Sequence, residues 1–186
     1  MKQWFAILLA GAAAGVFAGT PGVLGDGRTG HSAGRDDGRY QEDEPVQELK
    51  DVEPPAFPKQ ENLREFYVSA ATSNKYFIDA STLAVGADGI VRYVLVVQTS
   101  GGATNISFEG INCKERQWKH YATGRSDSTW VKSRATRAEW RLVENKPVNR
   151  YHAALNRDLF CPDGIPIHTA DEGRNALRLG KHPRSN

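Results

Sequence analysis

The chain has 186 residues and a formal net charge of +2, and hydrophobic residues make up 39% of it. This length suits one domain with a moderate core. The one long apolar run, residues 4–17, is too short and too rich in Ala and Gly for a stable membrane span, and no second run follows. The composition therefore excludes a membrane protein of several spans.

The N-terminus has the pattern of a signal peptide. Lys2 precedes the apolar run, and Val16 and Ala18 stand at the −3 and −1 positions of a cleavage site. We therefore expect residues 1–18 to direct export and to be removed. A cysteine for lipid attachment does not follow, because the nearest one is Cys113, so a soluble mature protein is expected.

Residues 19–53 are predicted to form a flexible acidic arm. Gly, Asp, Arg and Ser dominate residues 22–39, which have too little apolar surface to offset the entropy of ordering. Residues 26–53 contain nine acidic and four basic residues, a net charge of −5, whereas residues 54–186 contain nineteen basic and thirteen acidic residues, a net charge of +6. We hypothesise that the arm folds back on a basic face and weakly inhibits it in a salt-sensitive way.

The folded domain is predicted to begin near Pro54 and to extend to Asp163. Residues 53–58 are rich in proline and favour an extended conformation, in which Phe57 offers an anchor to the domain.

Short strand patterns recur through most of this domain. Strand-like runs occupy residues 66–68, 76–78, 90–98, 104–108 and 116–122. Asp88-Gly89 predicts a hairpin turn before residues 90–98, which are β-branched or apolar at nearly every position and so predict a central strand buried on both faces. Because the connections are short, successive strands are expected to form an antiparallel meander.

The last predicted element is an amphipathic helix over residues 149–160. Its apolar residues recur at helical spacing, Asn149 is a candidate cap, and Cys161-Pro162 predicts the end. Residues 164–186 are polar and basic, and we expect a partly disordered tail. The predicted fold class is α+β: an antiparallel sheet with one C-terminal helix packed on a face.

Cys113 and Cys161 are the only two cysteines. In an exported protein they are most simply one disulfide, since an oxidising compartment makes the bond persist. Two buried free thiols and a metal-binding pair without CxxC spacing are the alternatives. A disulfide would tether the helix to the sheet.

Three motifs carry a resemblance to a known family. They are Phe77-Ile-Asp-Ala-Ser-Thr-Leu83, Asp88-Gly-Ile-Val-Arg-Tyr93 and Asn105-Ile-Ser-Phe-Glu-Gly-Ile-Asn-Cys113, together with Tyr121, Gly124, Trp130, Trp140 and the closing Phe160-Cys161. As a set they resemble the cryptic neisserial protein family of exported bacterial proteins, over roughly residues 54–161. The resemblance implies a Gram-negative periplasmic location and no established activity, so it carries over no functional residue.

A second likeness, to the surface-adhesin E family, rests on the order of elements. The chain has Asp-x-Ser, a hairpin, a long apolar strand, Cys, a basic strand, Trp, and a helix ending in Cys. This likeness implies an antiparallel sheet with a C-terminal helix tethered by a disulfide, and a binding role. The chain has no cysteine for a lipid anchor, and this counts against display on the cell surface.

A few polar residues near strand ends are candidates for a site. They are Asp79, Ser81, Glu109 and His120. No GxSxG elbow surrounds Ser81, so we interpret Asp79 and Ser81 as the cap of a turn. We expect Glu109 to form a structural ion pair with Arg92 or Arg116, and a ligand contact is the alternative.

The five histidines are scattered and form no HExxH motif: His31, His120, His152, His168 and His182. We therefore expect no metal site, and we expect no cofactor.

Residues 116–141 interleave basic and aromatic side chains. The basic ones are Arg116, Lys119, Arg125, Lys132, Arg134, Arg137 and Arg141, and the aromatic ones are Trp118, Tyr121, Trp130 and Trp140. Such mixing suits anionic polymers, although the structural interpretation is that tryptophans pack in the core and bases solvate the outer faces. The possible ligand-binding residues are Arg116, Trp118, Lys119 and Glu109; nucleic acid is not the expected ligand.

We expect a periplasmic, non-enzymatic binding or envelope-associated module with no catalytic residue, whose partner is an unknown protein or an anionic envelope ligand. One alternative is an envelope hydrolase that uses Glu109 or Asp79 with His120. Another is a surface adhesin, secreted or displayed. A deep cleft that holds those polar side chains together would favour the hydrolase, and a flat sheet face would favour a binding module.

Overall fold

A computed structural model describes residues 47–134 and 139–185, and its eight strands form one antiparallel sheet. The strands are β1 (Leu63–Phe66), β2 (Lys75–Asp79), β3 (Ala84–Val85), β4 (Val91–Gln98), β5 (Thr104–Asn112), β6 (Gln117–Gly124), β7 (Trp130–Lys132) and β8 (Arg141–Leu142). Their order is β1-β2-β4-β5-β6-β7, with β3 also paired to β4 and β8 to β6. The antiparallel sheet confirms the predicted class. The predicted signal peptide, residues 1–18, and the arm up to residue 46 lie outside the described residues.

The central strand β4 is buried on both faces, as its apolar composition predicts. Residues 91–96 are all buried. Because alternate side chains point to opposite faces, Tyr93 packs in a cluster with the helical residue Leu155, whereas Val94 packs in a second cluster on the other face. We call these the helix-side face and the outer face of the sheet.

The turn at Asp88-Gly89 joins β3 to β4, as the sequence predicts. The amide of Gly89 donates to the carbonyl of Gly86 at 2.9 Å, and the φ of Gly89 is +69°, a value that suits glycine. The Asp88 side chain accepts the amide of Ile90 at 3.2 Å. The turn thereby fixes a carboxylate that the candidate site uses.

β5 and β6 are joined across a β-bulge. Phe108 pairs with Ala122 while Glu109 pairs with His120, so Tyr121 is the extra residue of β6. A bulge interrupts the alternation of side chains, and Tyr121 packs on the outer face together with Ala122.

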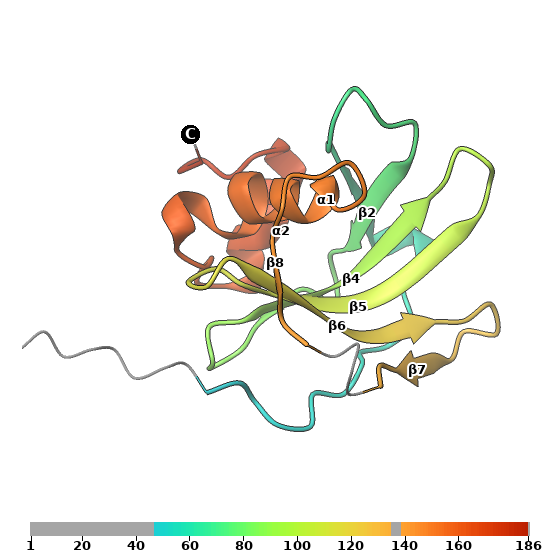
Figure 1. Ribbon diagram of the computed structural model, residues 1–186, viewed down its shortest axis with the longest axis horizontal. Helices are drawn as coiled ribbons and strands as arrows, with labels where there is room; N and C mark the ends of the chain where they lie inside the picture. Colours follow the sequence, from blue (N-terminus) through green and yellow to red (C-terminus); the bar gives the residue numbers. More distant parts are fainter. Residues whose placement is uncertain (1–46, 135–138, 186) are drawn as a thin grey trace, which may run out of the picture. The chain divides into compact units, whose positions relative to one another are not determined.

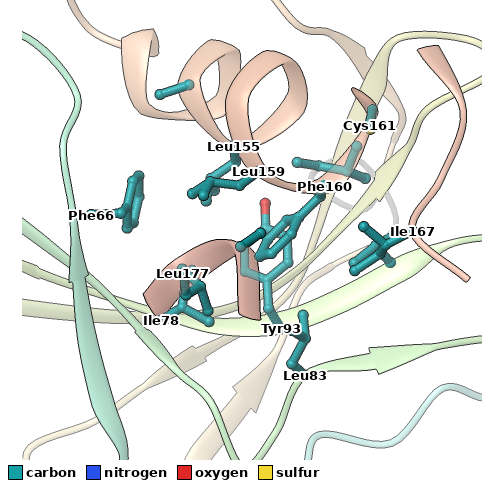
Figure 2. Packing of buried hydrophobic residues seen from close by; sticks show 14 of the residues in the cluster. Phe66, Ile78, Leu83, Tyr93, Leu155, Leu159, Phe160, Cys161, Ile167 and Leu177 are labelled. Carbon is teal, nitrogen blue, oxygen red and sulfur yellow. The ribbon is translucent and has the colours of Figure 1, made fainter. Parts of the chain in front are cut away.

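The predicted helix over residues 149–160 is present in two forms. α1 spans Arg150–Ala154, and η2, a π-helix, spans Leu155–Phe160. Leu155, Leu159 and Phe160 are buried, and Phe160 lies against Tyr93 with ring centroids 5.4 Å apart (Figure 2). This helical segment therefore packs on the sheet, as predicted.

The disulfide between Cys113 and Cys161 confirms the predicted pairing. The S–S distance is 2.07 Å and the Cα atoms are 5.4 Å apart, a normal separation. Cys113 follows β5 and Cys161 follows η2, so the bond joins the sheet to the helix end.

The segment after Asp163 differs from the expected fraying tail. A short 3-10 turn, η3 (Pro162–Gly164), leads to a second helix, α2 (Ala170–Leu179), whose Ala176 and Leu177 are buried in the helix-side cluster. Figure 1 shows α1 and α2 on the same side of the sheet. This helix is not predicted from the sequence because only a narrow apolar stripe of it packs on the core. Charged residues cover its exposed side.

The outer face is covered by the end of the predicted arm, and we call residues 47–58 the strap. Val52 packs against the outer cluster, and Phe57 lies against Trp130 with tilted rings whose centroids are 5.3 Å apart. Figure 1 shows the segment before η1 (Gln60–Asn62) and β1 on the side of the sheet away from the helices. The folded part thus includes residues before Pro54, the predicted boundary.

Candidate functional site

The four predicted ligand residues lie at three separate places. Glu109 and Trp118 lie on the helix-side face and both contact His152 of α1. Lys119 contacts the strap on the outer face. Arg116 lies in the turn between β5 and β6. Alternation along β6 separates Trp118 from Lys119, so the four side chains do not form one site.

Glu109 is the centre of a buried polar cluster. Its carboxylate lies 2.9 Å from Nε2 of His152 and 3.4 Å from the hydroxyl of Tyr93. It also accepts a hydrogen bond from the hydroxyl of Ser107 at 2.7 Å. Burial raises the pKa of Glu109, but the charge of His152 and the hydrogen bonds from His152 and Ser107 together lower that pKa below its ordinary value. Trp118 stacks on the His152 ring at 3.7 Å. The arrangement holds a negative carboxylate in the core.

The prediction that Glu109 pairs with Arg92 or Arg116 is wrong. Tyr93 is opposite Glu109 in the β4–β5 register, so Arg92, one residue earlier, faces the outer side and bonds to both oxygens of Asp88 at 3.0 and 2.5 Å. The buried partner of Glu109 is instead His152 of α1, which lies 43 residues further along the chain.

The hydrolase candidates do not gather in one cleft. Asp79 Oδ1 accepts the amide and the hydroxyl of Ser81 at 2.9 and 2.6 Å, which confirms the turn cap. β4 and β5 separate the strand of Asp79 from the strand of His120, a distance of roughly 14 Å at normal strand spacing. Glu109 and His120 are register partners, but Glu109 is only 2% exposed.

The strap places Glu48 in a site built from β6 and the segment before β8. Both carboxylate oxygens of Glu48 contact Nζ of Lys119, at 2.9 and 2.8 Å. The hydroxyl of Tyr121 donates to the same carboxylate at 2.9 Å, and Nε1 of Trp140 donates to it at 3.1 Å. Four donor contacts therefore converge on one carboxylate. We call Lys119, Tyr121 and Trp140 the strap site.

Aromatic rings partly enclose the lysine of the strap site. Nζ of Lys119 lies 5.4 Å from the ring centroid of Tyr121 and 5.6 Å from that of Trp140, and the side chain of Lys119 is only 15% exposed. A partly dehydrated ammonium attracts a carboxylate more strongly than one in water. Burial, followed by the charge of Glu48, raises the pKa of Tyr121, although nearby Arg92 lowers it; its hydroxyl remains a donor.

Asp88 and Arg92 support the strap site from the side of β4. Oδ2 of Asp88 accepts the backbone amide of Leu49 at 2.9 Å, and the Arg92 guanidinium lies 5.6 Å from the Tyr121 ring. Burial raises the pKa of Asp88, but hydrogen bonds from Arg92, Leu49 and Ile90 lower it below its ordinary value. Asp88 is therefore an ionised acceptor for the strap backbone.

Further along the strap, a second set of contacts repeats this combination of charge and aromatic rings. Glu53 forms an ion pair with Lys132 of β7, and Nε1 of Trp130 donates to the carbonyl of Pro55 at 2.9 Å. A hollow of about 520 Å³ lies between the strap and β6–β7. The strap therefore does not fill the outer face completely.

The basic and aromatic run over residues 116–141 contains the strap site, but the sequence does not show which of its residues form the site. Lys119 is a predicted ligand residue, whereas Tyr121 and Trp140 are predicted only as aromatic neighbours of the basic residues. The opposite net charges of the arm and the domain predict that the two come into contact. They do not show that Glu48 is the arm residue that contacts Lys119. The observed contacts of Glu48 and Glu53 with lysines agree with an arm that folds back on a basic face.

Arg116 lines a different hollow, of about 610 Å³, beside the disulfide. Its lining also includes Arg157 and Asn156 of η2. Arg157 forms an ion pair with Asp158 at 2.6 Å, and the Asn156 amide donates to Sγ of Cys161 at 3.0 Å. Arg157 and Asn156 are therefore bonded to close neighbours in the sequence.

Across the described ranges, no helix is long and apolar enough to cross a membrane. In the same part of the chain, no group of three His, Cys, Asp or Glu side chains is placed to hold a metal ion.

A comparison with protein families matches residues 41–178 to the CNP1-like family. The match begins within the predicted arm, before the strap, and ends within α2, so it covers both segments that lie beyond the predicted domain. No curated protein and no solved structure matches the chain.

Proposed function

The chain belongs to the CNP1-like family, and from that premise we propose that it is a periplasmic, non-enzymatic binding module for an anionic ligand. The strap site on the outer face is its binding surface. In the structure described here, the chain's own Glu48 takes the place of the ligand.

One observation carries this proposal: four donor contacts converge on the Glu48 carboxylate from Lys119, Tyr121 and Trp140. Charge-assisted hydrogen bonds from a partly buried lysine and two aromatic donors are the means by which proteins hold an anionic group. A surface lysine that only solvates the domain would need no such enclosure.

The absence of catalysis is part of the proposal and rests on what the polar groups already do. Glu109 and His152 are buried and bonded to each other, and Asp79 caps a turn. Beside the strap site, the carboxylate of Asp88 is already bonded to Arg92 and to the Leu49 amide. These features suit binding better than hydrolysis.

The periplasmic location rests on the predicted signal peptide and on the disulfide, since disulfides persist outside the reducing cytosol. Protease treatment of whole cells, compared with cells whose outer membrane has been permeabilised, tests it. We expect degradation only after permeabilisation, whereas degradation on intact cells would identify a surface adhesin.

Glu48→Gln tests the binding surface. Removing the charge of the internal occupant should make the mature full chain elute from a heparin column at a higher salt concentration than wild type, because Lys119 becomes available. Lys119→Gln added to Glu48→Gln should reverse the increase.

Glu61→Gln is the matched control, because Glu61 is exposed in η1 and its loss changes the net charge equally. Equal retention of Glu48→Gln and Glu61→Gln would show that only net charge matters and would remove the proposed site.

A further inference from the structure

The strap engages the outer face through both its side chains and its backbone. Its contact points are the Glu48 carboxylate, the Leu49 amide, the Val52 side chain, the Glu53 carboxylate, the Pro55 carbonyl and the Phe57 ring. Resting on the function proposed above, we propose that the ligand is an acidic, extended peptide segment of another protein, bound in place of the strap. The peptide would carry two carboxylates separated as those of Glu48 and Glu53 are.

The positions of the two lysines set the length of the ligand. Lys132 pairs with Ala122, which lies three residues along β6 from Lys119, or about 10 Å at the rise of a strand. A single small anion cannot contact both lysines. A peptide with two glutamates five residues apart reaches both, as the strap does.

Two backbone contacts favour a peptide over an anionic polysaccharide. The Asp88 carboxylate accepts an amide hydrogen from Leu49, and Nε1 of Trp130 donates to the carbonyl of Pro55. A peptide supplies both an N–H donor and a C=O acceptor at every residue except proline. A sulfated sugar would instead bring negative charge toward Asp88, an acid that is 6% exposed.

The charged contacts of the strap differ in how far they are exposed. In the Glu53–Lys132 pair, the two side chains are 68% and 60% exposed, and Leu49 is 47% exposed. Exposed ion pairs of this kind contribute little to stability. Glu48 is therefore the principal anchor among the charged contacts of the strap.

Competition with the strap defines the regulation of the site. A tethered segment acts as a competitor at an effective concentration in the millimolar range, so an external peptide must displace it. If the strap binds its site less tightly, a larger fraction of molecules has a free site. The apparent Kd of the peptide falls in inverse proportion to that fraction. Glu48→Gln should therefore make the site available to a peptide in trans.

The test uses the mature full chain and a synthetic peptide of residues 47–58 as the probe, with binding followed by titration calorimetry. We expect Glu48→Gln protein to bind the peptide at least five-fold more tightly than wild type does. A peptide with glutamine at both glutamate positions should bind at least ten-fold more weakly than the unmodified peptide.

Two further variants in the Glu48→Gln background locate the binding. Lys119→Gln should abolish peptide binding, whereas Lys146→Gln, in an exposed pair with Glu144, should leave it unchanged. Unchanged thermal unfolding of both variants would show that the loss is not a folding defect. Equal effects of the two lysine substitutions would overturn the assignment of the peptide to the strap site.

The outcomes separate this inference from the function on which it rests. If Glu48→Gln protein binds a heparin oligosaccharide but not the peptide, the anionic-ligand function stands and the peptide class is wrong. If neither probe binds, both proposals fail. If the wild-type chain forms a concentration-dependent dimer that Lys119→Gln abolishes, the occupant is the strap of a second copy, and the proposal of a different partner is overturned.

Discussion

At the residue scale, Glu109 shows how a buried charge is tolerated in this core. Its carboxylate is satisfied by His152 and Ser107, and the Trp118 ring covers His152. Burial of an isolated carboxylate would be costly, whereas a paired and hydrogen-bonded one can remain ionised. The residue therefore joins α1 to β5 through a polar contact inside an apolar layer.

Glu109→Gln should lower the free energy of unfolding by about 3 kcal/mol at pH 7, because one partner of a buried pair loses its charge. Urea denaturation measures the change. Glu115→Gln, at an exposed position in the next turn, is the matched control and should change stability by less than about 0.5 kcal/mol. A loss of similar size in both variants would contradict a specific role for the buried pair.

The same pair predicts how stability depends on pH. The pKa of Glu109 is lower in the folded protein than its ordinary value of 4.5, so the unfolded chain binds more protons between the two pKa values. The stabilisation is fully present above pH 4.5 and is lost as the pH falls through the folded pKa. The stability difference between wild type and Glu109→Gln should therefore shrink from pH 6 to pH 3. A difference that stays constant would exclude this linkage.

At the scale of elements, the disulfide and the two helices determine how the helix-side layer is held. Cys113 and Cys161 are 48 residues apart and join the end of β5 to the end of η2. α2 then adds buried residues to the same cluster. The layer is thus closed by one covalent link and by two packed helical segments.

Replacing both cysteines by alanine should lower the free energy of unfolding by about 4 kcal/mol, because a closed loop of this length restricts the unfolded chain. Urea denaturation of oxidised wild type, reduced wild type and the double variant measures the effect. Since the chain has no other cysteine, reduction should reproduce the loss of the double variant. Equal stability of oxidised and reduced protein would contradict the tethering role.

The cap of α2 gives a test of its contribution. Thr169 Oγ1 accepts the amide of Glu172 at 3.1 Å, so Thr169→Ala should destabilise the protein by about 1 kcal/mol. Thr169→Ser keeps the acceptor and should restore most of the loss. Hydrogen exchange of residues 170–179 should increase in the alanine variant only. Unchanged exchange there would mean that the cap does not hold the helix.

At the scale of the whole molecule, charge separation along the chain becomes contact between the strap and the sheet. Two acidic residues of the predicted arm meet lysines of β6 and β7, and the strap covers apolar side chains of the outer face. The described fold therefore has a helical layer on one face of the sheet and the strap on the other. The proposed function belongs to this second face.

The antiparallel sheet, the buried central strand, the helix over residues 149–160 and the disulfide could all be predicted from the amino-acid sequence. These features follow from side-chain periodicity, turn residues and cysteine count, which are local or compositional properties. The opposite charges of the arm and the domain were also readable, because charge sums need no geometry.

The contacts between particular side chains could not be predicted from the sequence. The pairing of Glu109 with His152, the four contacts around Glu48 and the packing of α2 depend on strand register, a β-bulge and segments far apart in the chain. A single strand position decides which face of the sheet a side chain occupies. Arg92 therefore lies on the opposite face from Glu109 and bonds to Asp88 instead. Such contacts are set by three-dimensional packing, and no local pattern in the sequence encodes them.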